Sequence, residues 1–98
     1  MTSQLQQELW TSWASLLRSY AAVHGLGKSQ HAVVEVSDAE ILIRFGQRVC
    51  RFTADRYYGA DGKEQQFALT VNGRARVGDD EDEMDLFAER LASEIINA

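Results

Sequence analysis

The spacing of apolar residues changes once along the chain, and this change constrains the fold more than any other feature. Between Leu5 and His24, apolar and aromatic residues recur every three or four positions, which is the period of an amphipathic helix. Gly25 follows and predicts the end of that helix. From Gln30 onward the period is two, which predicts β-strands. The sequence therefore favours an α+β fold that begins with a helix over residues 3–24.

Short turns predict how the strands pair. A two-residue turn at residues 46–47 places Ile43 opposite Cys50, and one at residues 38–39 places Val34 opposite Ile43. Both turns put apolar residues on the same face of the sheet. The expected core face is Val34, Val36, Ile41, Ile43, Cys50, Phe52, Phe67, Leu69, Ala75 and Val77.

The glycine at position 73 predicts a further hairpin with a bulge. A two-residue turn there would direct Arg74 and Arg76 into the core, so we expect a three-residue loop with Gly73 in the left-handed conformation. The expected strands are residues 30–36, 40–45, 48–53, 65–71 and 74–77.

The last helix is expected to start at Asp79 or Asp80, because the following acids would lie at the positive end of the helix dipole. Its apolar stripe is Met84, Phe87, Ala88, Leu91 and Ile95. We therefore expect a single domain, residues 1–98, with both helices on one face of a four- to five-stranded antiparallel meander. This arrangement is a two-layer sandwich.

Composition limits the classes of protein to which the chain can belong. It has 98 residues, 45% of them hydrophobic, and a formal net charge of −5, which disfavours general binding of nucleic acid. The single cysteine cannot form an internal disulfide, and the first residues lack the charged and apolar regions of a signal peptide. No apolar run approaches the roughly 20 residues that span a bilayer. We expect a cytoplasmic protein without nucleic-acid or membrane partners.

Charge is distributed unevenly, and this is the feature that points to a partner. Residues 44–76 contain seven bases and three acids, a net of +4, whereas residues 77–98 contain one base and eight acids, a net of −7. The solvent-facing side of the sheet is expected to form a binding face, with arginines for charge-assisted bonds and apolar residues for contact. An ordinary solvated sheet face, or a symmetric dimer through it, are the alternatives. The expected binding residues on this face are Arg44, Arg51, Arg74, Arg76, Leu42 and Val49.

Residues 54–63 are expected to form the longest loop, and they contain the adjacent Tyr57 and Tyr58. Such loops are often functional, so both tyrosines are candidate binding residues that could close over the arginine-bearing face around a small ligand or anion. The alternative is that one tyrosine covers the sheet edge while residues 61–62 make a turn. Trp10 and Leu86 on the two helices form a weaker candidate interface.

Motifs for catalysis or metal binding are not found. The acids of residues 79–85 lack the glycine and the final glutamate of a calcium loop, and Gly59 to Lys63 lacks the spacing of a phosphate loop. His24 and His31 have no matching ligand spacing, and Cys50 has no identifiable partner base. The chain is therefore not expected to be an enzyme or to hold a cofactor or metal.

The expected order of elements is similar to that of frataxin-like domains. That family binds iron through acids of its first helix, where this chain has only Glu8, so the resemblance implies no iron site here. Size and acidity are similar to those of the dimeric chaperones of bacterial type III secretion, which usually carry a helix between their strands. The only room for such a helix here is residues 55–58.

These observations favour a non-enzymatic protein-binding or adaptor domain, chaperone-like in size, that associates with a protein partner or with itself. A small-ligand or anion-binding domain is the alternative.

Overall fold

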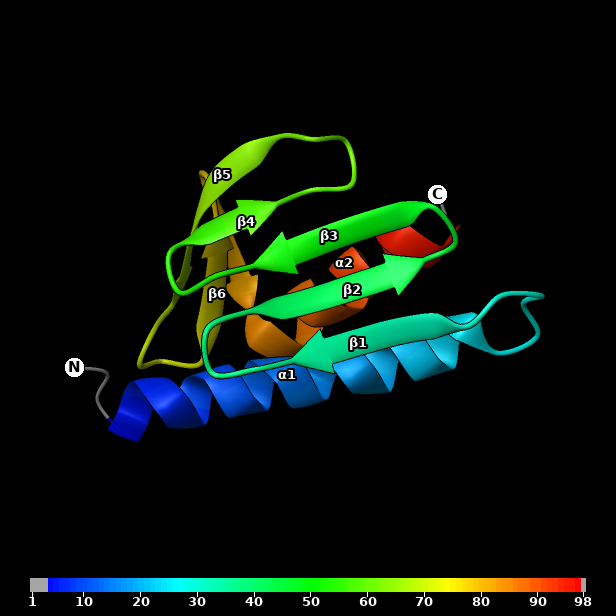
Figure 1. Ribbon diagram of the computed structural model, residues 1–98. Coiled ribbons are helices and arrows are strands. Elements are labelled where there is room, and N and C mark those ends of the chain that lie inside the picture. The colour runs from blue at the N-terminus through cyan, green and yellow to red at the C-terminus, as the bar shows by residue number, and fades with distance from the viewer. Residues whose placement is uncertain (1–3, 98) are drawn as a thin grey trace.

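A computed structural model describes residues 4–97 as two helices and seven antiparallel strands, with each strand paired to the next one along the chain (Figure 1). One helix precedes all the strands in the sequence, and the other follows them. The elements are α1 Gln4–Gly25, β1 Ala32–Val36, β2 Ile41–Phe45, β3 Arg48–Phe52, β4 Arg56–Tyr58, β5 Glu64–Leu69, β6 Arg74–Val77, β7 Asp80–Glu83 and α2 Met84–Asn97.

The pairing of β1, β2 and β3 agrees with the register predicted from the turns. Ile43 lies opposite Val34 on one side and opposite Cys50 on the other. Gly46 is the first central residue of the turn at residues 46–47, and its φ of +63° is the conformation that this position requires. Residues Ile41, Ile43, Cys50 and Phe52 are buried as predicted.

The bulged hairpin between β5 and β6 is also confirmed. Leu69 pairs with Ala75, and the Thr70 N–H donates to the Arg74 carbonyl at 2.8 Å. Gly73 has a φ of +78°, the left-handed conformation that glycine adopts without a steric penalty. This loop keeps Ala75 and Val77 in the core.

Two predictions about the sheet were wrong. Residues 56–58 form β4 instead of part of a loop, and the acids of residues 80–83 form β7 instead of the first turn of the last helix. That helix therefore begins at Met84, whose N–H donates to the Gly73 carbonyl at 3.0 Å. The Asp61–Gly62 turn is present, with a φ of +85° at Gly62.

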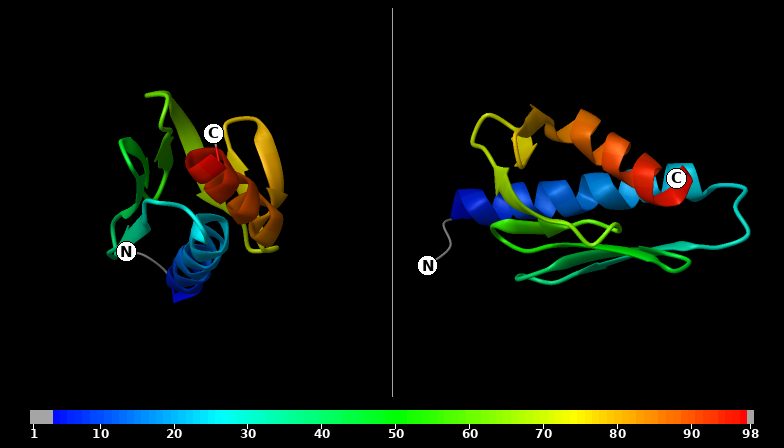
Figure 2. Two further views of the ribbon diagram at one scale, coloured as in Figure 1. Left: turned by 90° about the vertical axis from the view of Figure 1, so that its right-hand side faces the viewer. Right: turned by 90° about the horizontal axis from the view of Figure 1, so that it is seen from above.

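The predicted α+β fold with an antiparallel sheet is confirmed, but the sheet has seven strands and is curled into a half-barrel, which differs from the expected two-layer sandwich of four to five strands. The cause lies in β5, whose first half, residues 64–66, pairs with β4, while its second half, residues 67–69, pairs with β6. Strands β6 and β7 consequently turn away from the plane of β1 to β4 (Figure 2).

Both helices lie in the hollow of this sheet, as Figure 2 shows in end view. They pack against each other, and α1 also lies along β1. Trp13 of α1 is fully buried, with its ring centroid 5.5 Å from that of Phe52 and 5.7 Å from that of Phe67. Phe87 of α2 closes this aromatic cluster at 6.4 Å. No helix of residues 4–97 covers the opposite, convex side of the sheet, here called the outer face.

Candidate functional site

Five of the predicted binding residues lie together on the outer face. Strand alternation directs them away from the helices, and the pairing of β2 with β3 and of β3 with β4 makes them neighbours. We call this group the outer-face patch; it consists of Leu42, Arg44, Val49, Arg51 and Tyr58.

Arg44 is the cation of the patch that has no acidic partner. It is exposed and lies directly opposite Val33 on β1 and Val49 on β3. Both valines are exposed, at 42% and 37% respectively. Across residues 4–97, no carboxylate lies within ion-pair distance of its guanidinium. A guanidinium between two exposed aliphatic side chains can bind a carboxylate that is itself next to apolar surface.

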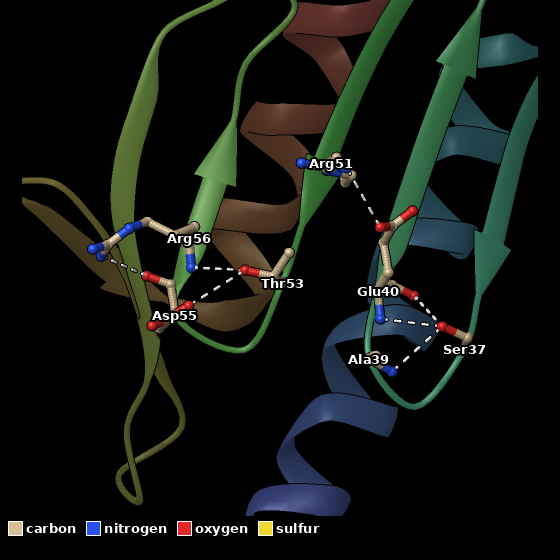
Figure 3. A network of polar contacts seen from close by, with 7 residues as sticks. All are labelled: Ser37, Ala39, Glu40, Arg51, Thr53, Asp55 and Arg56. Carbon is tan, nitrogen blue, oxygen red and sulfur yellow. Dashed lines mark hydrogen bonds and ion pairs between the residues drawn. The ribbon is translucent and has the colours of Figure 1, made fainter.

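Arg51 is held in place from two sides. Its guanidinium carbon lies 4.3 Å from the centre of the Tyr58 ring, a cation–π contact, and its Nη1 lies 3.6 Å from a carboxylate oxygen of Glu40. Figure 3 shows Glu40 and Arg51 reaching toward each other from neighbouring strands. The patch therefore contains one cation with protein partners and one without.

The two turns beside the patch are fixed by hydroxyl groups (Figure 3). Ser37 Oγ accepts hydrogen bonds from the N–H groups of Ala39 and Glu40, at 3.3 and 3.1 Å. Thr53 Oγ1 accepts one from the Arg56 N–H at 3.2 Å. Such side-chain bonds stabilise turns, so they fix the positions of Glu40, just before β2, and of Arg56, the first residue of β4.

Arg74 and Arg76 are not part of the patch, although the sequence predicted one continuous basic face. They lie on β6, and three strands separate β6 from β2, which corresponds to about 19 Å along the sheet. Glu81 of β7 lies directly opposite Arg76 and pairs with Arg74 at 2.9 Å. Glu81 of β7 therefore lies beside both arginines of β6 and forms an ion pair with Arg74.

Tyr57 and Tyr58 point to opposite sides of β4, so the prediction that both lie on a loop over the sheet face was wrong. Tyr57 stacks on Phe52 on the helix side, with ring centroids 4.6 Å apart, and burial raises its pKa. Burial also raises the pKa of Cys50 to about 12, and a hydrogen bond with Tyr57 lowers it in part. A neutral thiol at physiological pH is a poor nucleophile.

Other sequence candidates lie in structural roles. Trp10 packs against the core, and its indole N–H donates to the Ser37 carbonyl at 2.9 Å, so only Leu86 of that pair is exposed. His24 Nδ1 lies 3.2 Å from the side-chain nitrogen of Asn97, which links the ends of the two helices. Within residues 4–97, no three histidine, cysteine or acidic side chains are grouped closely enough to hold a metal ion.

Two neighbours of the patch were not among its predicted residues. Val33 shares a row with Arg44 and Val49, and Glu40 is the ion-pair partner of Arg51. The predicted register of the first hairpin already places Val33 opposite Arg44, so this neighbour was available from the sequence. Glu40 begins the predicted strand 40–45 and lies on the same side as Leu42, but the sequence does not indicate that its carboxylate pairs with Arg51.

No helix in the described part of the chain is long and apolar enough to cross a membrane. Comparisons of the chain with models of protein families, with curated proteins and with solved structures found no match.

Proposed function

We propose that the protein is a non-enzymatic protein-binding or adaptor domain, chaperone-like in size, that self-associates and uses the outer-face patch to bind a protein partner. The observation that carries this proposal is the position of Arg44 on the second strand of the sheet, where it is exposed between Val33 and Val49 and has no ion-pair partner within residues 4–97. A charged group without an internal partner on a stable sheet adds little to the fold but can add a charge-assisted bond to a complex.

The chemistry of the patch favours a partner segment that presents a carboxylate beside an aliphatic side chain. Arg44 would bind the carboxylate, and the exposed valines with Leu42 would contact the aliphatic group. Arg51 is already oriented by Tyr58 and Glu40, so it loses little conformational freedom when a second carboxylate approaches it.

Peptides in which glutamate alternates with leucine or valine test this proposal. We expect them to shift the amide NMR signals of β2, β3 and β4, and versions with lysine in place of glutamate to have no effect. Arg44→Glu should weaken binding by about tenfold or more, since it reverses the central charge. Lys63→Glu is the matched control, because it makes the same change of net charge in an exposed turn. Shifts that map to the helices, or equal losses in both variants, would contradict the proposal.

A cavity at one end of the molecule favours small-ligand binding as a second candidate function, at a different place from the one the sequence suggested. It has a volume of about 410 Å³ and lies between the first turns of α1 and the neighbouring strand ends. Its apolar lining includes Trp10, Phe67 and Leu69, and Asp38 is the one charged residue among the described residues that line it. Neutral or cationic apolar compounds should raise the thermal midpoint and alter tryptophan fluorescence, and Thr11→Trp should block both effects. If no compound in such a screen has these effects, the cavity is not a ligand-binding site.

A further inference from the structure

Strand β1 forms one edge of the sheet, and its outward backbone groups have no partner among residues 4–97. The pair that closes the first hairpin is bonded, with the Ser37 N–H donating to the Glu40 carbonyl at 2.8 Å. Bonded and non-bonded pairs alternate along an antiparallel ladder, so Val33 and Glu35 bond to β2. Ala32, Val34 and Val36 direct their N–H and C=O groups away from β2. No side chain or backbone group of residues 4–97 hydrogen-bonds to them.

The two edges of the sheet differ in how they are protected. The other edge, β7, consists of four consecutive acids, Asp80–Glu83. Two copies of that strand cannot lie side by side without bringing like charges together, which is a common protection against edge pairing. Strand β1 has the sequence Ala-Val-Val-Glu-Val, with Glu35 as its only charge and with Val33 exposed. The β1 edge therefore lacks the charge protection of β7, and α1 lies along β1 on the helix side of the sheet.

We propose that the β1 edge pairs with β1 of a second copy of this chain, antiparallel, with Val34 opposite the second copy's Val34 on a two-fold axis. In this register, every outward N–H and C=O of Ala32, Val34 and Val36 finds a partner. A shift of the axis to either neighbouring residue leaves one of these three residues outside the ladder. A shift toward Glu35 would also place the two Glu35 side chains opposite each other.

The avoidance of like charges favours the same register. Val33 lies opposite the second copy's Glu35 on the outer face, so no like charges meet. The outer faces of the two sheets become continuous, and both outer-face patches lie on one surface. This inference rests on the self-association in the proposed function, and it leaves the patch of each copy free for a partner.

Proline at position 34 tests the edge directly. Val34→Pro removes an N–H that points away from β2, so the ladder between β1 and β2 stays intact, as is usual for proline in edge strands. Val34→Ala is the matched control, because it removes side-chain atoms but keeps the N–H. Light scattering should give twice the 11.0 kDa chain mass for the wild type and for Val34→Ala, and the mass of one chain for Val34→Pro.

Two variants that place opposite charges at position 33 give a second test, which does not depend on a proline substitution. Val33→Glu would face the second copy's Glu35 and should weaken the dimer about tenfold or more, whereas Val33→Lys should preserve it. Within one chain the preference is the opposite, because residue 33 lies opposite Arg44. A loss of dimer in Val33→Glu with retention in Val33→Lys therefore cannot result from a weakened fold.

The possible results distinguish a failure of pairing through β1 from a failure of self-association or of partner binding at the patch. A dimer that persists in Val34→Pro and Val33→Glu would overturn the edge while self-association stands. A wild type that stays monomeric at all concentrations would overturn self-association itself, and binding at the patch would still be decided by the titration of Arg44→Glu. Loss of dimer in those two variants, with circular dichroism spectra equal to that of the wild type, supports the edge.

Discussion

Single residues show how tightly the core excludes charge. Cys50 is almost fully buried between β2 and Tyr57, and burial raises its pKa from 9.0 to about 12. The thiol can therefore ionise in the unfolded chain at a pH where it stays neutral in the folded protein. Such a group stabilises the fold fully below pH 9, and this contribution is lost as the pH rises toward 12.

We accordingly expect the free energy of unfolding to fall by about 1.4 kcal/mol per pH unit above pH 9 through this residue. Urea unfolding at a series of pH values measures the loss, and Cys50→Ala should show a shallower decline than the wild type. Alkylation at neutral pH should require unfolding. Parallel pH curves for the two proteins, or fast alkylation of the folded wild type, would show that the thiol is not buried as described.

Trp13 shows a different property of the core. Its side chain is fully buried, yet its indole N–H has no hydrogen-bond partner within residues 4–97. The edge-on contacts with the Phe52 and Phe87 rings supply packing, but they do not replace a conventional acceptor. The residue is therefore held by shape and apolar contact, and hydrogen bonding has no part in it.

At the scale of elements, α2 is anchored at both ends by residues far away in the sequence. The Met84 N–H bonds to the Gly73 carbonyl at its start, and Arg48 Nη1 donates to the Ile95 carbonyl at 2.7 Å near its end. The last carbonyl groups of a helix lack partners within the helix, and a cation there also interacts favourably with the dipole.

Arg48→Ala should therefore destabilise the protein by about 1.5–3 kcal/mol, the usual range for a hydrogen bond to a charged group. Urea unfolding measures the change, and hydrogen exchange should show faster opening of the last turn of α2. Arg48→Lys retains the charge but not the guanidinium geometry, so we expect an intermediate loss. An unchanged last turn in Arg48→Ala would mean that this bond does not hold the helix end.

Elements with clear turns were predictable from the sequence, and short or charged elements were not. The register of β1 to β3 followed from residues 38–39 and 46–47 because apolar residues then share one face. Strand β4 has three residues, too few to show an alternation. Tyr57 was predicted to lie on a loop because this strand was not recognised, and a residue outside a strand cannot be assigned to one side of the sheet.

Strand β7 was missed although its turn resembles one that was recognised. Gly78 has a φ of +60° and occupies the same place in its turn as Gly46. That turn puts Asp80 and Asp82 on the helix side of the sheet, which hydrophobic patterning argues against. The edge position makes it possible, because Asp80 reaches Arg90 of α2 at 2.7 Å and needs no place in the core. The position of β7 at the edge of the sheet therefore outweighed its unfavourable hydrophobic pattern.

For the whole molecule, curling of the sheet explains why the predicted basic face is divided. A flat sheet would place the arginines of β2, β3 and β6 on one surface, but the half-barrel turns β6 away, and Glu81 of β7 pairs with Arg74 of β6. The curl follows from the divided pairing of β5, which no residue pattern indicates. The patch on β2 to β4 could thus be predicted, while its separation from β6 could not.

The acids of β7 are expected to limit how many molecules associate. Glu81→Gln with Glu83→Gln removes the outward charges of this edge, and we expect species larger than a dimer in light scattering at high concentration. Glu89→Gln with Glu94→Gln on α2 changes net charge equally and should leave the mass unchanged. An identical mass for both variants would mean that charge does not protect this edge.

The packing of α1 against α2 has a consequence for the order in which the protein can be made. Ribosomes synthesise α1 and the strands first, so the hollow of the sheet stays open until Met84–Asn97 have emerged. At about 5–20 residues per second, the apolar surface of the nascent chain is exposed for a time on the order of seconds. Contacts between distant parts of a chain also form slowly. During translation, the incomplete chain therefore exposes apolar surface of α1 and of the strands that α2 later covers.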